Sequence, residues 1–232
     1  LVAGRVFWLA VVMISLNAVI MLYGLRYISS GLGAVISSAF TPITLLGFAV
    51  AMGQERFARR HAYALALGIV GVLLLFGPQA LAGRLDAAEL LGAGGVLIGT
   101  ICYSFASVLA RPMMRTLPPV QMVGLTNLMG GVVLIIGSLA FEPGAWHAMA
   151  LDWGAEAWAG WAFLVLAGSL GATIIYFFLV RDWGASRTGT YAFISPIVAV
   201  LLGMAVFGER VHVTDAAGMA LMLVAAAVVL RK

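Results

Sequence analysis

The sequence predicts an all-α membrane protein with eight transmembrane helices, and three observations support this. Hydrophobic residues make up 63% of the chain and charged residues only 9%, with a mean hydropathy of +1.10. Long runs without Asp, Glu, Lys or Arg recur along the chain, and one stretch of sequence occurs twice. A soluble domain does not have this composition, so the fold must be one that a lipid bilayer can surround.

The charge-free runs give the expected helices in chain order. Each of the first seven holds at least 20 residues, which as helix cross about 30 Å of hydrocarbon. The last run is shorter and reaches that length if its helix starts near Val211, with Asp215 at the headgroup level. Continuously apolar runs of this length exclude a β-barrel, whose strands alternate over about ten residues. The runs are 6–25, 27–54, 61–83, 90–110, 116–141, 157–180, 188–208 and 216–230.

Basic residues set the expected orientation. If the helices alternate in direction, ten of the 13 Lys and Arg residues fall on one side, which is therefore predicted to be cytoplasmic and to hold the C-terminus. They are Arg5, Arg56, Arg59, Arg60, Arg111, Arg115, Arg181, Arg187, Arg231 and Lys232, against Arg26, Arg84 and Arg210 on the other side. The same asymmetry explains the net charge of +4, so we expect no nucleic-acid partner.

Residues 51–76 and 205–230 form a repeat with a constant offset of 154. The offset pairs Glu55 with Glu209, Arg56 with Arg210 and Pro42 with Pro196. Because the alternating helices place the two Glu-Arg pairs on opposite sides, the repeat is predicted to be inverted, as in many secondary transporters. We expect residues 1–80 to hold an incomplete first repeat of three helices and residues 89–232 a second repeat of five.

The counterparts of the spans at 90–110 and 116–141 would precede Leu1. The expected architecture is therefore a ten-helix bundle of two inverted five-helix repeats, lacking here its first two helices of roughly 60 to 70 residues.

Three segments resemble the EamA-type repeats of the drug/metabolite transporter superfamily. They read YGLRYISSGLGAVISSAFTPITLLGF at 23–48, YFFLVRDWGASRTGTYAFISPIVAVLLG at 176–203 and FGERVHVTDAAGMALMLVAAAVVL at 207–230. The resemblance implies a secondary transporter in the inner (cytoplasmic) membrane that moves a small organic solute by alternating access, with export of amino acids or related metabolites. It also implies that the first, second, sixth and seventh spans of this chain surround the solute path.

Charged and metal-binding groups are missing from the middle of the expected spans. His61, His147 and His212 fall at helix ends or in loops, and the single Cys102 is expected to be a packing residue. The sequence therefore predicts no metal, no cofactor and no catalytic residue, and a protein that is not an enzyme. A noncatalytic scaffold or partner subunit is the main alternative, and a membrane-embedded enzyme is a weaker one. The oligomeric state is left open.

Neutral polar residues remain as candidates to line the path, because polar groups at membrane depth must contact water, solute or protein. The candidates are Asn17, Tyr23, Ser38, Thr41, Tyr103, Asn127, Tyr176, Tyr191 and Ser195, with Ser37, Thr173 and Thr190 as further hydroxyls. A single Ser or Thr can instead bond to its own helix, and Asn17 and Asn127 can join neighbouring helices.

Two motifs have a mechanical or structural interpretation. Pro42 and Pro196 each remove a helical hydrogen bond near the middle of a span, which predicts either a hinge or a kink that only shapes packing. Glu55 and Glu209, with Arg56 and Arg210, are expected to serve the short turn and the start of the following helix, and so to have a structural role.

Overall fold

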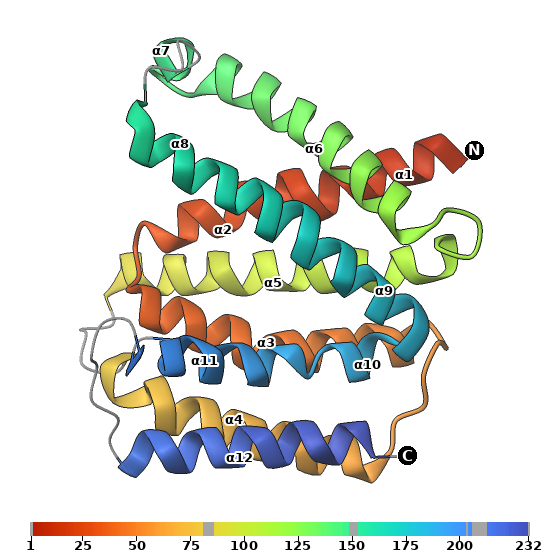
Figure 1. Cartoon of the computed structure of the whole chain (residues 1–232), viewed down its shortest axis with the longest axis vertical. Coiled ribbons are helices and arrows are strands. Elements are labelled where there is room, and N and C mark those ends of the chain that lie inside the picture. The colour runs from red at the N-terminus through yellow and green to blue at the C-terminus, as the bar shows by residue number, and fades with distance from the viewer. Residues whose placement is uncertain (1, 81–85, 149–152, 203, 206–212, 232) are drawn as a thin grey trace.

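The structure is a computed structural model, and it describes residues 2–80, 86–148, 153–202, 204–205 and 213–231. All regular structure in these ranges is helical (Figure 1). The elements are α1 (Val2–Ala10), η1 (Val11–Leu16), α2 (Asn17–Leu25), α3 (Ser30–Ala51), α4 (Arg59–Ala80), α5 (Ala87–Met113), α6 (Pro119–Phe141), α7 (Ala145–Ala148), α8 (Gly154–Phe163), η2 (Leu164–Ala172), α9 (Thr173–Trp183), α10 (Ala185–Thr188), α11 (Tyr191–Leu202) and α12 (Val213–Leu230).

Seven helices among the described residues are long and apolar enough to cross a membrane, which confirms the all-α membrane fold class. They are Ala3–Leu25, Gly31–Ala51, Ala87–Met113, Pro119–Phe141, Gly154–Trp183, Ala185–Leu202 and Val213–Leu230. The remaining predicted span, 61–83, is third in chain order. It coincides with α4 as far as Ala80, and its last residues lie outside the described ranges.

Local sequence explains where several helices begin and end. The Ser29 hydroxyl accepts a hydrogen bond from the backbone N–H of Leu32 at 3.2 Å, which caps the start of α3. Asp86 caps α5 in the same way, accepting from the N–H of Glu89 at 2.8 Å. Gly184, with a φ of 91°, ends α9 and turns the chain into α10, because only glycine adopts this conformation at little cost.

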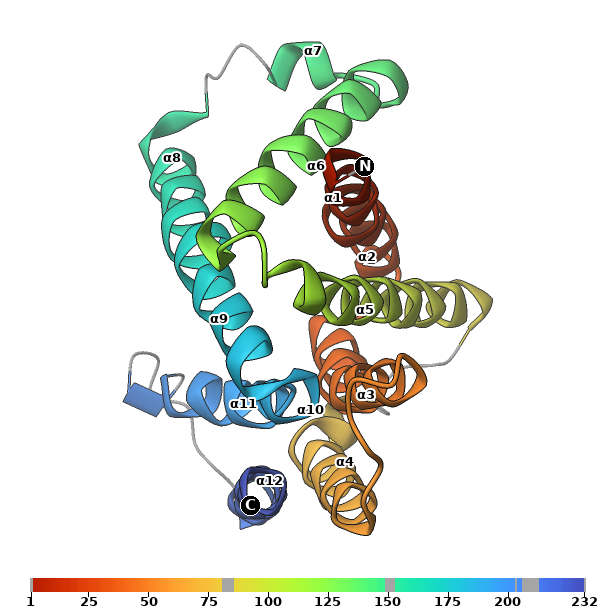
Figure 2. The ribbon, with the colours of Figure 1, turned by 90° about the vertical axis from the view of Figure 1, so that its right-hand side faces the viewer.

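Small residues let the helices pack closely. In Figures 1 and 2, α4 and α12 lie side by side at one edge of the bundle. A Cβ at Gly71 would stand 2.8 Å from the carbonyl oxygen of Gly218, and a Cβ at Gly218 would stand 2.7 Å from that of Gly71. Gly24 of α2 and Gly92 of α5 make the same reciprocal approach at 2.7 Å. The backbones of both helix pairs therefore touch.

Within the described residues, two spans contain a long π-helical segment, and residues 204–205, after α11, are π-helical as well. The span Ala3–Leu25 changes to π-helix over Val11–Leu16, and the span Gly154–Trp183 changes to π-helix over Leu164–Ala172. The offset of the sequence repeat carries 11–16 onto 165–170, so the two interruptions correspond. By contrast, α3 and α11 are helical on both sides of Pro42 and Pro196. The two long π-helical segments thus lie in the spans that precede those of the prolines, and π-turns often accompany functional sites.

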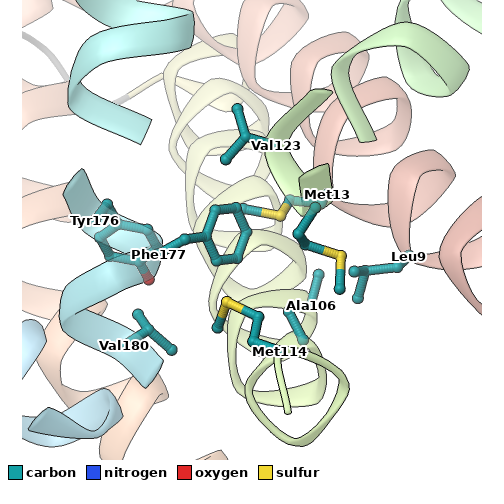
Figure 3. Packing of buried hydrophobic residues seen from close by; sticks show 10 residues of the cluster. Leu9, Met13, Ala106, Met114, Val123, Tyr176, Phe177 and Val180 are labelled. Atoms are coloured by element: carbon teal, nitrogen blue, oxygen red, sulfur yellow. The ribbon is translucent and has the colours of Figure 1, made fainter. Parts of the chain in front are cut away.

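A hydrophobic cluster joins the N-terminal and C-terminal parts of the chain (Figure 3). It brings together buried side chains of α1, η1, α5, α6 and α9, and Phe177 is fully buried at its centre. The labelled members are Leu9, Met13, Ala106, Met114, Val123, Tyr176, Phe177 and Val180. A second cluster packs α3 and α4 against α11 and α12. In it, the ring of Phe193 lies against Gly68 and leaves no room there for a larger residue.

Candidate functional site

A cavity of about 350 Å³ lies where α5, η2, α9, α10 and α11 meet, and we call it the tyrosine cavity. No charged residue of the described ranges lines it. Its lining residues are Tyr103, Ala172, Thr173, Ile175, Tyr176, Leu179, Thr188 and Tyr191. Three of the tyrosines predicted to line a solute path are thus brought together, from segments up to 88 residues apart in the sequence.

Tyr176 is the central member of this group. Its ring centroid is 5.6 Å from that of Tyr103, with the planes inclined at 40°, and 5.6 Å from that of Tyr191, at 81°. The side chain is buried, and its hydroxyl makes no hydrogen bond within the described part of the chain. Ser107 is the neighbouring polar group, but its hydroxyl donates to the carbonyl of Tyr103 at 2.7 Å.

The local backbone explains how these side chains converge. Thr173, the first residue of α9, donates its hydroxyl to the carbonyl of Gly168 at 3.1 Å, five residues earlier, which matches the wide turn of the π-helix before it. Tyr176 follows one turn later. Thr188 donates to the carbonyl of Gly184 at 2.7 Å and closes α10, after which the chain enters α11 at Tyr191. The Tyr191 hydroxyl approaches the buried Thr41 of α3.

Other predicted path residues lie away from this cavity. Tyr23 is 46% exposed, carries the guanidinium of Arg26 over its ring at 4.7 Å, and faces a groove of about 530 Å³ between α2 and α6. Ser195 is exposed on α11. Asn127 donates its amide to the carbonyl of Val123 at 3.0 Å, a bond within its own helix. None of these three lines the tyrosine cavity.

Asn17 and the hydroxyls of α3 occupy a different environment. The side-chain oxygen of Asn17 is buried without a hydrogen-bond partner in the described residues, and it faces Gly99, where a Cβ would come within 3.1 Å. Ser37 has a buried hydroxyl with no partner in the same ranges. Ser38 is half-buried, and Pro42 is buried close to Gly189 in the turn before α11.

Two contacts between helices were not anticipated from the sequence. The Thr44 hydroxyl donates to Ser104 Oγ at 2.7 Å and joins α3 to α5. The buried Ser15 hydroxyl donates to the carbonyl of Gly130 at 2.9 Å and joins η1 to α6. Each is one small hydroxyl among several in an apolar span, and nothing in the sequence distinguishes the hydroxyls that bond across helices from the others.

The Glu55 carboxylate joins three elements at one end of the bundle. It accepts hydrogen bonds from the backbone N–H of Ser186, at 3.2 Å, and from the Ser186 hydroxyl. Arg111, in the last turn of α5, lies 3.7 Å away. Arg56 is exposed beside it. Glu209 and Arg210, the predicted counterparts in the second half, lie outside the described residues.

A larger hollow of about 950 Å³ lies between the start of α1 and the end of α5, and none of the predicted path residues lines it. Within the described ranges, no group of three or more His, Cys, Asp or Glu side chains could hold a metal ion. The tyrosine cavity is therefore the site with which the predicted residues agree best. Its aromatic rings and the unpartnered Tyr176 hydroxyl suit a small organic molecule with a polar group.

Comparisons with known proteins agree with a membrane transporter. The profile of the EamA-like transporter family matches residues 90–231. The chain is 30% identical over 183 residues to the uncharacterized inner membrane transporter YedA of Escherichia coli, covering 78% of this chain and 56% of that protein. It is 24% identical to an uncharacterized transporter of Archaeoglobus fulgidus, covering 98% of this chain and 78% of the relative.

A plant relative and a solved structure extend the comparison. A chloroplastic WAT1-related protein of Arabidopsis thaliana is 25% identical, over 87% of this chain and 48% of its own length. One crystal structure superimposes with a TM-score of 0.79 at 18% identity, covering 97% of this chain and 75% of the other, and so shares the fold. The chain spans little more than half the length of the E. coli relative.

Proposed function

Since the chain belongs to the EamA-like transporter family, we propose that it is a secondary transporter that carries a small neutral or zwitterionic organic solute through the tyrosine cavity by alternating access. Amino acids and related metabolites, moved outward across the inner (cytoplasmic) membrane, are the proposed cargo. The protein acts as a carrier in the lipid bilayer, with its C-terminus in the cytoplasm, and not as an enzyme.

The observation that carries this proposal is the free hydroxyl of Tyr176 between two aromatic rings. A buried hydroxyl without a partner is unfavourable by about 1–3 kcal/mol, a cost that a bound polar group would remove. The faces of Tyr103 and Tyr191 attract an ammonium group through their ring quadrupoles. A cavity with these two features favours an amine or amino acid over a multiply charged anion.

Alternating access requires a site between parts of the protein that move relative to each other. The tyrosine cavity adjoins η2 through Ala172, and the offset of the sequence repeat pairs η1 with η2. The predicted inverted repeat, with residues 1–80 in one half and 89–232 in the other, would let the two halves exchange conformations. At one end of the bundle, Glu55 and Ser186 join segments from both halves and would have to separate.

Counterflow into proteoliposomes tests the transport function. Vesicles loaded with unlabelled solute would be diluted into a panel of labelled amino acids and amines, with empty liposomes and an unrelated membrane protein as controls. We expect saturable, substrate-selective accumulation of at least one amino acid or amine. If the protein is folded and no member of a broad panel is exchanged, the proposal is wrong and a noncatalytic partner role becomes the better interpretation.

A further inference from the structure

A second cavity, of about 300 Å³, lies at the end of the bundle where the α3–α4 connection, the end of α5 and α10 meet, the end that Figure 2 faces. We call it the arginine cavity. Its lining residues are Glu55, Arg56, Arg60, His61, Arg111, Trp183, Ser186 and Arg187. Four guanidinium groups thus surround one carboxylate, which leaves an excess of three positive charges around one hollow.

The carboxylate is already engaged. Glu55 accepts two hydrogen bonds from Ser186 and pairs with Arg111, so it offsets only one of the four arginines. Arg60 donates to the backbone carbonyl of Arg231 at 2.9 Å, which satisfies one donor but carries no counter-charge. The positive charge of the cavity is therefore not neutralised by the residues that line it.

Two of the guanidinium groups have no partner among the described residues. The Arg56 and Arg187 side chains make neither a hydrogen bond nor an ion pair there, and both residues line the cavity. His61 adds no donor at Nδ1, because that nitrogen accepts a hydrogen bond from the backbone N–H of Ala58 at 3.3 Å. The charged donors that remain unused in the cavity are guanidinium groups, which form paired hydrogen bonds to planar or tetrahedral oxyanions.

We propose that the arginine cavity binds a phosphate-bearing anion, either the headgroup of an anionic phospholipid or free phosphate. The excess of positive charge favours an anion, and the guanidinium forks of Arg56 and Arg187 match the oxygen spacing of a phosphate group. Trp183, 54% exposed at the rim, is of the type that lies at the headgroup level of a membrane. Basic pockets between membrane helices bind such headgroups.

This site is distinct from the tyrosine cavity and goes beyond the proposed transport function, because no residue lines both. A phosphate held by Arg56 and Arg187 would connect the α3–α4 connection to α10, the same two segments that Glu55 and Ser186 join. The bound anion would therefore reinforce that contact.

Thermal unfolding of the purified protein in phosphate-free detergent solution tests the proposal without any knowledge of the cargo. The midpoint would be followed against inorganic phosphate, soluble short-chain phosphatidylglycerol and the zwitterionic short-chain phosphatidylcholine, at constant ionic strength. A ligand of the folded state raises the midpoint as it saturates its site. We expect a saturable rise with phosphatidylglycerol that exceeds any rise with phosphatidylcholine. A similar rise of the midpoint with inorganic phosphate would show that free phosphate is sufficient to bind the cavity. No rise with inorganic phosphate would identify the lipid headgroup as the ligand.

Arginine variants locate the site. Arg56→Gln and Arg187→Gln should each weaken the apparent affinity about fivefold, since one basic residue near an anionic headgroup contributes about that factor. Arg181→Gln is the matched control, because Arg181 bonds to Asp182 at 2.6 and 3.0 Å and does not line the cavity. Arg56 is exposed and unpartnered in the described ranges, so its variant should fold even if Arg187→Gln does not. No saturable rise with either anion, or equal weakening by Arg181→Gln, would overturn the proposal.

Discussion

The Glu55 carboxylate accepts hydrogen bonds from both the backbone N–H and the hydroxyl of Ser186, a residue 131 positions further along the chain. Arg111 approaches the same carboxylate at 3.7 Å. The connection between α3 and α4 therefore holds the start of α10 and the end of α5 together. This contact closes one end of the bundle, and it leads to the first two predictions.

Glu55→Gln should destabilise the protein with little effect on which solute it selects. The amide keeps one acceptor but loses the charge that strengthens both Ser186 bonds, and we expect a loss of about 1–2 kcal/mol in unfolding free energy. Thermal unfolding in detergent measures it. Glu142→Gln is the control, since the Glu142 side chain is exposed and its bond among the described residues is to the Ser138 hydroxyl of its own helix, and it should cost less than about 0.5 kcal/mol. An equal loss in both variants would contradict a special role for the Glu55 contact.

Gly184→Ala should be more damaging than the same change at another glycine with positive φ. At Gly184 the φ is 91°, and a Cβ would stand 2.5 Å from Glu55 Oε1, so backbone strain and a steric clash add together. At Gly154 the φ is 78° with no atom within 4 Å, so Ala there brings strain alone, about 1 kcal/mol. Unfolding midpoints of the two variants should differ clearly. Equal midpoints would mean that the Glu55 side chain can move away from the new methyl group without loss of stability.

Tyr176→Phe should weaken transport while leaving the fold intact. The change removes a hydroxyl that has no partner in the described residues, so stability should be unchanged or slightly higher. If that hydroxyl binds the solute, the half-saturating concentration in counterflow should rise about tenfold, the value of one well-formed hydrogen bond of about 1.4 kcal/mol. Tyr23→Phe, outside the tyrosine cavity, should change neither quantity. Unchanged counterflow by Tyr176→Phe would remove its hydroxyl from the solute site.

Gly71→Val should separate α4 from α12. A Cβ at Gly71 already falls 2.6 Å from Met222 Cγ and 2.8 Å from the Gly218 carbonyl oxygen, and the larger side chain must displace the helix. We expect a destabilisation of about 2 kcal/mol or more, measured by thermal unfolding. A Cβ at Gly47 on α3 would meet no atom within 4 Å, so Gly47→Val serves as the control, with a change of less than about 1 kcal/mol. A mild effect at Gly71 would show that the two helices can move apart at little cost.

The helices themselves were predictable because their signal is local. Long apolar runs bounded by charges located the spans that Ala87–Met113 and Pro119–Phe141 occupy. Tyr103, Tyr176 and Tyr191, which line the tyrosine cavity, were each predicted as path candidates because they are polar groups in apolar runs. The sequence could not predict which of the polar candidates share a cavity. This depends on how each helix is rotated about its own axis, and in nearly uniform apolar spans no polar face indicates that rotation.

Long-range contacts account for most of what the sequence did not predict. Glu55 was expected to serve its own turn and the helix that follows, yet its carboxylate reaches Ser186. Adjacent charged residues suggest local roles, and no sequence pattern reports a partner 131 residues away. The π-helical segments were missed for a similar reason. Val11–Leu16 consists of ordinary apolar residues and one Ser, which favour α-helix and π-helix alike in a membrane.

The π-helical segments also change how the spans that contain them must be read on a helical wheel. A π-turn that accommodates one extra residue advances the direction of every later side chain by about 100° relative to an unbroken α-helix. Asn17 follows η1, and Thr173 and Tyr176 follow η2. A wheel drawn with one continuous period from Ala3 or Gly154 would assign such residues to the wrong stripe. Cysteine-accessibility scans of these two spans should therefore show a break in phase at the π-helix, with separate periodicities before and after it.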